Sequence, residues 1–343
     1  MGQVLDCPVH TPTDMPPNPL QDPQFLPFKL DLADARVLFV RLDARLRAEA
    51  AFLDERALPP APEGYWLSLD AWLAAAPSAT TPLRLDWLFH IGHCGSTLLS
   101  RLLQAWPEAA PLREPLPLRA LAALDAGDTQ RMRVMLRRLA QDWTRPLPPA
   151  SRTVIKATSS CNALAGDALR LHADSRALWL DVALEPWLAT ILKSQGSIGD
   201  VLAAASERAR LLAGDDEGIA AELRGLSPQR QCAMCWLAER VRYARLRAAL
   251  PDRCLHVDFD DLLARPEAVL STITVHLDLD HARIADVLAS PWWRRYSKAG
   301  EHAYAADDRA ADLKLAHERF GDAIRDAQAW LDGFLVRHPY LAA

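Results

Sequence analysis

The sequence lacks several features that would assign the protein to a class at once. It has no block of lysine and arginine, and its formal net charge is only −5 over 343 residues. This mild balance argues against nucleic acid or a membrane surface as a partner. No apolar run approaches the length of a membrane span. The first thirty residues are rich in proline and have no apolar core of signal-peptide length, so we expect a cytoplasmic protein.

The six cysteines also lack the pattern of a disulfide framework, which is typical of reduced thiols in a cytoplasm. Cys232 and Cys235 form a CxxC pair, but they lie within "QCAMCWLAERVRYARLRAAL", a clearly helical segment. No second cysteine pair follows, and a zinc site needs four ligands. His90 and His93 have no third ligand in view either. We therefore interpret Cys232 and Cys235 as thiols on a helix face, and we predict no metal site.

The first part of the chain, residues 1–82, is predicted to be an extension of the main domain. Residues 1–27 are rich in proline and predict an irregular arm. The segment 32–58, "LADARVLFVRLDARLRAEAAFLDERAL", favours one or two helices, and 67–76, "LSLDAWLAAA", favours a short one. "PSATTP", at 77–82, is typical of a linker. We therefore expect a helical extension, which either covers a substrate site or makes a dimer.

The second part, residues 83–343, predicts a parallel α/β sheet. Short apolar runs typical of buried strands alternate with helical patterns, and the chain from about residue 305 is mostly helical. The strand candidates are "LRLDWLFHI" (83–91), "RTVIKA" (152–157), "RALWLDVAL" (176–184) and "DRCLHVDF" (252–259). The fold class expected is an α/β parallel sheet flanked by helices, with the first strand ending at Ile91 and the next helix beginning near Ser96.

The stretch "FHIGHCGSTLLSRLL" joins that strand to that helix and carries the parts of an anion-binding loop. Gly92 and Gly95 permit a tight turn and a close backbone approach. The hydroxyls of Ser96 and Thr97 fall in the first helical turn, where backbone N–H groups and the helix dipole favour an anion. The stretch does not match G-x-x-x-x-G-K-[ST], because the glycines are too close and no lysine follows Gly95. A capped strand-to-helix turn without a ligand is the alternative.

The loop resembles the phosphosulfate-binding loop of sulfotransferases that use 3'-phosphoadenosine 5'-phosphosulfate (PAPS). That loop has a basic residue, a small residue, glycine and two hydroxyl residues, as in "HCGST" from His93 and Cys94 to Gly95, Ser96 and Thr97. Further segments resemble the same family over about residues 83–280, in the manner of a bacterial-type branch. They are "LREP" (112–115), "VIKA" (154–157) and "VDFDDLLARPEAVLSTITVHLDL" (257–279).

The resemblance implies a P-loop NTPase-like fold, an activity and a set of residues. Glu114, nineteen residues after Gly95, falls on the catalytic glutamate of the tyrosylprotein type and is expected to be the general base. Lys156 and His93 complete the implied catalytic set. PAPS is the implied co-substrate, and residues 93–97 would bind it without a metal ion. The acceptor would be a small molecule or a peptide. Alternatively, Glu114 pairs with Arg113 at the surface, and Lys156 points into water at a strand end.

Two positions depart from the family pattern. His93 replaces the usual lysine or arginine, and histidine, with an ordinary pKa of about 6.5, is mostly neutral at pH 7. The arginine that binds the 3'-phosphate is also missing, because Ala183 and Leu184 occupy its expected position. Possible substitutes there are Thr190, Lys193 and Ser194.

A late aromatic and basic loop, "WWRRYSKAGEHAY" at 292–304, is the candidate for closing over a nucleotide. Arg295, Ser297 and Lys298 would contact a phosphate, and Trp292 or Trp293 would stack on a base; packing of the tryptophans in the core is the alternative. Two other function classes stay open. One is a P-loop kinase or hydrolase, which needs an acid such as Asp181 or Asp258 to hold magnesium. The other is a degenerate, non-catalytic P-loop binding protein. A homo-oligomer is also possible.

Overall fold

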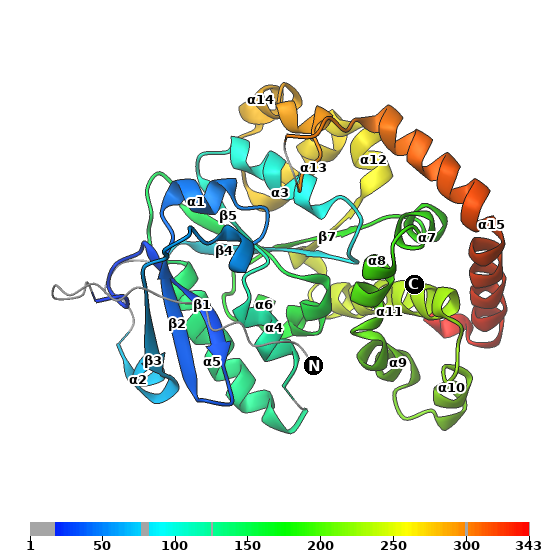
Figure 1. Ribbon diagram of the computed structural model, residues 1–343, viewed down its shortest axis with the longest axis horizontal. Coiled ribbons are helices and arrows are strands. Elements are labelled where there is room, and N and C mark those ends of the chain that lie inside the picture. Colours follow the sequence, from blue (N-terminus) through cyan, green and yellow to red (C-terminus); the bar gives the residue numbers. More distant parts are fainter. Residues whose placement is uncertain (1–17, 77–81, 125, 299–300, 343) are drawn as a thin grey trace. The chain divides into compact units, whose positions relative to one another are not determined.

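The five strands of the main sheet confirm the predicted α/β class (Figure 1). A computed structural model describes residues 18–76, 82–124, 126–298 and 301–342. The strands are β4 (Arg84–His90), β5 (Ala109–Arg113), β6 (Arg152–Lys156), β7 (Ala177–Asp181) and β8 (Cys254–Asp258). Their order in the sheet is β5-β6-β4-β7-β8, and the pairs β5/β6, β6/β4 and β7/β8 are parallel. Short apolar runs therefore identified β4, β6, β7 and β8, whereas β5 was not among the strand candidates.

The chain divides into two compact units, and each is described by itself. The first consists of Met1–Leu88 and Leu99–Arg176, and the second of Phe89–Leu98 and Ala177–Ala343. The domain boundary expected at residue 82 stays a prediction, and the linker residues 77–81 lie outside the described residues.

The first unit begins with an antiparallel sheet, so the prediction of a helical extension is wrong. Its strands β1 (Phe25–Asp31), β2 (Arg36–Arg41) and β3 (Gly64–Ser68) have β2 in the middle. Val37, Leu38, Phe39 and Val40 are all fully buried, which requires cover on both faces of β2. Such a continuous apolar run suits a buried strand, and its pairing on both sides overrides the helix-forming residues around it.

Short helices complete the first unit. They are α1 (Ala44–Glu49), α2 (Leu69–Ala74), α4 (Pro117–Ala122), α5 (Thr129–Trp143) and α6 (Ala165–Arg170). The helix expected over 67–76 is confirmed by α2, which begins after Ser68, whose hydroxyl accepts from the N–H of Ala71. Both α4 and α5 pack on β1. The predicted irregular arm lies mostly outside the described residues, and its last three residues begin β1.

Buried arginines bond the early segments of the first unit to its later ones. The guanidinium of Arg113 donates to the carbonyls of Ala48 and Ala50, and that of Arg101 donates to the carbonyls of Ala48 and Glu49. Arg145 likewise donates to carbonyls of residues 19, 22 and 25. Burial, helped by the nearby Arg101 charge, lowers the pKa of Arg113 to about 9. These cations are held by backbone oxygens, which offset part of the cost of burying them.

The second unit is mostly helical around β7 and β8. Its helices are α7 (Leu184–Ile191), α8 (Gln195–Leu202), α9 (Ala205–Ala213), α10 (Glu217–Glu222), α11 (Pro228–Ala249), α12 (Phe259–Ala264), α13 (Pro266–Leu277), α14 (Ile284–Leu288) and α15 (Ala306–Arg337). The long helix α11 packs against α9 and α15, and α15 packs against α7 (Figure 1). The helical tail expected from about residue 305 is confirmed by α15. Among the described residues, no helix is long and apolar enough to cross a bilayer.

Cys232 and Cys235 lie in α11, as expected, and both thiols are buried. Burial raises the pKa of Cys232 to about 12 and that of Cys235 to about 11. Beside them, the buried Arg208 donates to the Glu239 carboxylate at 2.8 Å. Across the described ranges, no group of three histidine, cysteine or acidic side chains is arranged to hold a metal ion.

Candidate functional site

The loop after β4 has a backbone shape that few residues adopt. β4 ends at His90 and α3 (Ser96–Leu102) begins at Ser96, within one residue of the predicted boundaries. Between them, Gly92, His93 and Gly95 have φ values of 82°, 51° and 79°. Glycine adopts this left-handed region readily, whereas a histidine there is uncommon. His93 therefore holds a strained conformation, of the kind that clusters at functional sites.

Side chains from the second unit fix the loop in place. Trp187, in α7, donates its indole N–H to the carbonyl of Gly92 at 2.8 Å. The Gly92 N–H donates to Nδ1 of His90 at 3.0 Å, and the Cys94 thiol donates to the carbonyl of Leu180 at 3.4 Å. These bonds attach both halves of the loop to neighbouring residues and stabilise its shape.

At Gly95 the structure excludes a side chain outright. A Cβ built there would lie 2.0 Å from Cε2 of Phe259, far inside van der Waals contact. Phe259 begins α12 and lies in the segment 257–279 that the sequence analysis singled out. Its ring therefore packs on the loop backbone, a contact that the sequence did not reveal.

The backbone beyond Gly95 offers donors to an anion. Across the described ranges, no group accepts a hydrogen bond from the backbone N–H of Gly95, Ser96 or Thr97. The Ser96 and Thr97 side chains are 5% and 2% exposed. Unpaired N–H groups in a nearly buried loop are costly unless a ligand or water accepts from them. The loop is thus suited to hold an oxyanion.

His93 has an acidic neighbour that the sequence did not indicate. Its Nε2 lies 3.8 Å from a carboxylate oxygen of Asp200, in α8. The imidazole is 19% exposed and the Asp200 side chain 78% exposed. The contact is an ion pair when the imidazole is protonated, so Asp200 favours the charged form of His93.

A carboxylate–ammonium pair occupies the first unit at the ends of β5 and β6. The Lys156 ammonium donates to Oε1 of Glu114, and the two side chains are 1% and 10% exposed. The backbone N–H of Glu114 donates to the Lys156 carbonyl at 2.7 Å. Glu114 also has a positive φ of 53°, which a non-glycine residue rarely adopts. The site thus holds a buried charge pair on strained backbone.

Both surface alternatives for these residues are wrong. Glu114 is not an exposed partner of Arg113, because the Arg113 guanidinium donates to backbone carbonyls and to the Ser100 hydroxyl. Lys156 does not point into water, since it is almost fully buried. Their burial is consistent with catalytic roles, and those roles stay predictions.

Four further side chains surround the pair. Arg119 and Thr158 lie 3.5 and 3.4 Å from Oε2 of Glu114. The Phe52 ring lies 5.4 Å from the Lys156 ammonium and 4.1 Å from the Arg56 guanidinium, as in cation–π contacts. Phe52 and Arg56 come from the early segment after α1, and no motif marked them. The extension therefore contributes directly to the surroundings of the predicted base.

The residues expected near a 3'-phosphate already have protein partners. The Thr190 hydroxyl donates to the Pro186 carbonyl at 2.9 Å, and Lys193 pairs with Asp312 at 3.1 Å. Ser194 caps α8 by accepting from a backbone N–H. None of these three residues is an arginine, and each already has a protein partner.

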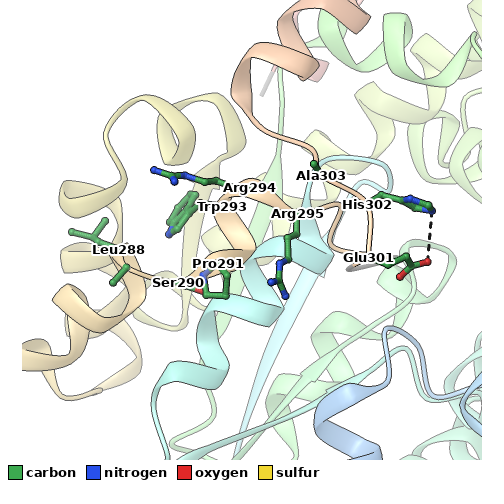
Figure 2. Close-up of a pocket in the computed structure, with 10 residues that line it drawn as sticks. Leu288, Ser290, Pro291, Trp293, Arg294, Arg295, Glu301, His302 and Ala303 are labelled. Carbon is green, nitrogen blue, oxygen red and sulfur yellow. Dashed lines mark ion pairs between the residues drawn. The ribbon is translucent and has the colours of Figure 1, made fainter.

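The late loop forms a turn beside a cavity of about 800 Å³ (Figure 2). Arg295 and Ala303 form an isolated antiparallel β-bridge, so Ser297 and Lys298 lie in the turn between them. Residues 299–300 are outside the described part. Figure 2 shows Arg294 and Arg295 extending in different directions. The Trp293 indole donates to the Val287 carbonyl at 2.8 Å, which favours packing over base stacking for this ring.

The acids considered for magnesium are also paired. The two carboxylate oxygens of Asp181 contact His256 at 2.7 Å and Arg240 at 2.8 Å. Asp258 caps α12 by accepting from the N–H of Asp261. Both carboxylates therefore already have protein partners, and both oxygens of Asp181 are occupied.

No protein-family model and no curated protein matches the sequence. In structure, the chain is similar to the sulfotransferase domain from the curacin biosynthetic pathway, with a TM-score of 0.40 and 14% identity over 70% of this chain and 91% of that one. It is also similar to sulfotransferase STF9 from Mycobacterium avium, with a TM-score of 0.35 and 14% identity over 70% and 78% of the two chains.

A third similar structure is mouse sulfotransferase SULT7A1 complexed with PAP, with a TM-score of 0.34 and 9% identity over 72% and 88% of the two chains. These structural neighbours are sulfotransferases. Because the TM-scores and identities are low, we rest the functional proposal on the chain's own residues.

Proposed function

We propose that the protein is a sulfotransferase, which moves a sulfuryl group from PAPS to a hydroxyl or amine acceptor. The observation that carries the proposal is the loop from His93 to Thr97. It combines a glycine pressed against Phe259, unpaired backbone N–H groups and two hydroxyl side chains. This arrangement is complementary to a phosphosulfate group.

The donor end of PAPS fits these residues. Backbone N–H groups of Gly95 to Thr97 would donate to its oxygens, and any residue larger than glycine at position 95 would fill the space that Phe259 occupies. A protonated His93, favoured by Asp200, would supply the positive charge that lysine or arginine supplies in the family.

Glu114 is the proposed general base. It would take the proton from the acceptor hydroxyl or amine as that atom bonds to sulfur and the bond from sulfur to the nucleotide oxygen breaks. The nucleotide leaves as adenosine 3',5'-bisphosphate. Lys156 would hold the carboxylate in position through its contact with Oε1. Oε2 lies 3.5 Å from Arg119 and 3.4 Å from Thr158, and it is the oxygen we assign to the proton transfer.

Recognition of the 3'-phosphate is expected to be weak. Thr190 and Lys193 already bond to the Pro186 carbonyl and to Asp312, and Ser194 caps α8, so protein groups already hold all three side chains. We therefore expect adenosine 3',5'-bisphosphate to bind less than about tenfold more tightly than adenosine 5'-monophosphate, a difference of about 1.4 kcal/mol.

The kinase alternative has less support. That class needs a Walker lysine and an acid free to hold magnesium, whereas Asp181 and Asp258 both have protein partners. A non-catalytic binding protein is the other alternative, and His93 in place of a fixed charge is the observation that favours it.

Calorimetry separates these classes. Adenosine 3',5'-bisphosphate should bind without magnesium, and ATP with magnesium should not bind more tightly. Transfer of ³⁵S from labelled PAPS to a panel of phenols and amines then tests catalysis. Binding of ATP with magnesium alone would favour the kinase class, and bisphosphate binding without transfer to any acceptor would favour the binding protein.

A further inference from the structure

A second cavity lies in the second unit, between α11 and β8. Its volume is about 510 Å³, and its lining includes Arg240, Tyr243, Arg247 and His256 together with small apolar residues such as Ala248. Sites for small molecules are commonly cavities of roughly 300–1,000 Å³ with apolar walls and a few polar groups. No step of the proposed sulfuryl transfer uses these residues.

Asp181 contacts two of the residues that line this cavity, Arg240 and His256. Its side chain is 2% exposed, and it accepts from Arg240 at 2.8 Å while lying 2.7 Å from Nε2 of His256. The imidazole itself is 35% exposed. A buried carboxylate thus fixes the orientation of a half-exposed histidine through Nε2–H, and in the protonated ring Nδ1–H is the donor left for an anionic ligand.

Aromatic rings form another side. The Tyr243 ring lies 5.4 Å from the His256 ring and 5.7 Å from the Trp179 ring. Burial raises the pKa of Tyr243, while the nearby Arg247 guanidinium acts in the opposite direction. The hydroxyl therefore stays protonated at neutral pH and is able to donate a hydrogen bond.

The charges around the cavity do not cancel. Arg240 is neutralised by Asp181, but no described carboxylate pairs with Arg247, which is exposed on the same helix. Arg247 therefore leaves a positive charge at the cavity, next to flat rings and a histidine nitrogen. A guanidinium forms strong, directional hydrogen bonds to a carboxylate, and flat rings favour a flat partner.

We propose that this cavity binds a small aromatic carboxylate, held by Arg247 and His256 through its charge and by Tyr243 through its ring. The site is independent of the nucleotide loop, so it stands whether or not the chain is a sulfotransferase.

Benzoate is the probe, and its binding is followed by calorimetry and ligand-observed NMR on the full chain. Arg247→Gln and His256→Asn should each weaken benzoate binding by about tenfold or more, the usual effect of losing a hydrogen bond to a charged group. Arg245→Gln is the matched control, because Arg245 is also exposed on α11 but donates to the Leu211 carbonyl. It should bind benzoate like the wild type.

Two reference ligands test the chemistry. Benzyl alcohol has the ring without the charge, and inorganic phosphate has the charge without the ring; both should bind more weakly than benzoate. The proposal is overturned if benzoate does not bind at millimolar concentration, if Arg247→Gln binds it like the wild type, or if either reference ligand binds as tightly.

Discussion

The Phe259 ring occupies the space that a side chain at Gly95 would need. The two residues are far apart in the sequence, yet a Cβ at Gly95 would lie 2.0 Å from the ring. One contact therefore joins the loop after β4 to the first residue of α12, and it explains why this position has to be glycine.

Gly95→Ala should abolish most nucleotide binding. The new methyl group meets Phe259, and the positive φ of 79° adds backbone strain, so the loop has to move. We expect the affinity for adenosine 3',5'-bisphosphate, measured by calorimetry, to fall by about tenfold or more.

Gly199→Ala is the control for this change. Nothing lies within 4 Å of its added Cβ, and the residue is inside α8, where alanine is favoured by about 1 kcal/mol. Binding should be unchanged. A Gly95→Ala protein that binds the nucleotide as well as this control would contradict the role of the 93–97 loop in nucleotide binding.

Glu114→Gln should separate catalysis from stability. Loss of the general base should slow turnover by roughly 10²–10⁴-fold, while nucleotide affinity stays the same. The variant also leaves the buried Lys156 without its charged partner, which should lower the free energy of unfolding by about 3 kcal/mol.

The double variant Glu114→Gln with Lys156→Met tests this account. Removing both charges should restore much of the stability in urea denaturation, but not the turnover. Full transferase activity in the single variant would remove Glu114 from the mechanism.

His93→Lys should strengthen binding at higher pH. Lysine carries its charge at pH 8, whereas histidine ordinarily does not. Both side chains meet the same backbone strain at position 93, so the substitution changes mainly the charge. We expect nucleotide affinity to weaken between pH 6 and pH 8 in the wild type and to stay level in the variant. Equal pH profiles would mean that position 93 does not contact the anion.

The buried thiols should resist alkylation in the native protein. Burial raises the pKa of Cys161 and Cys232 to about 12 and that of Cys235 and Cys254 to about 11. A raised pKa leaves less reactive thiolate at any pH below it. With Cys7 changed to Ser, these four should react with iodoacetamide at pH 8 at least about a hundredfold more slowly than in urea, as judged by mass spectrometry. Rapid labelling of Cys232 and Cys235 would instead indicate accessible, reactive chemistry.

The sequence predicted the parts of the fold that depend on local pattern. Apolar runs such as 152–157 identified parallel strands, because strands buried on both faces need no alternation. The same property misled at Val37–Val40: the run lies among residues that favour helix, and only pairing with β1 and β3 makes it a strand.

Within the candidate site, the loop residues could be predicted from the sequence, because glycines in a tight turn and hydroxyl residues in a first helical turn form a local pattern. Phe52, Arg56 and Asp200 were not, since their importance comes from distant contacts and not from any spacing. The pairing of Glu114 with Lys156 lay between these cases: each residue was predicted, but their contact was not.

The arginines that bond the early segments of the first unit make residues 19–50 an integral part of that unit. Arg101, Arg113 and Arg145 all donate to carbonyl oxygens of this segment. Removing the segment would therefore take acceptors from three guanidiniums at once, and it should lower the stability of the later part of the unit.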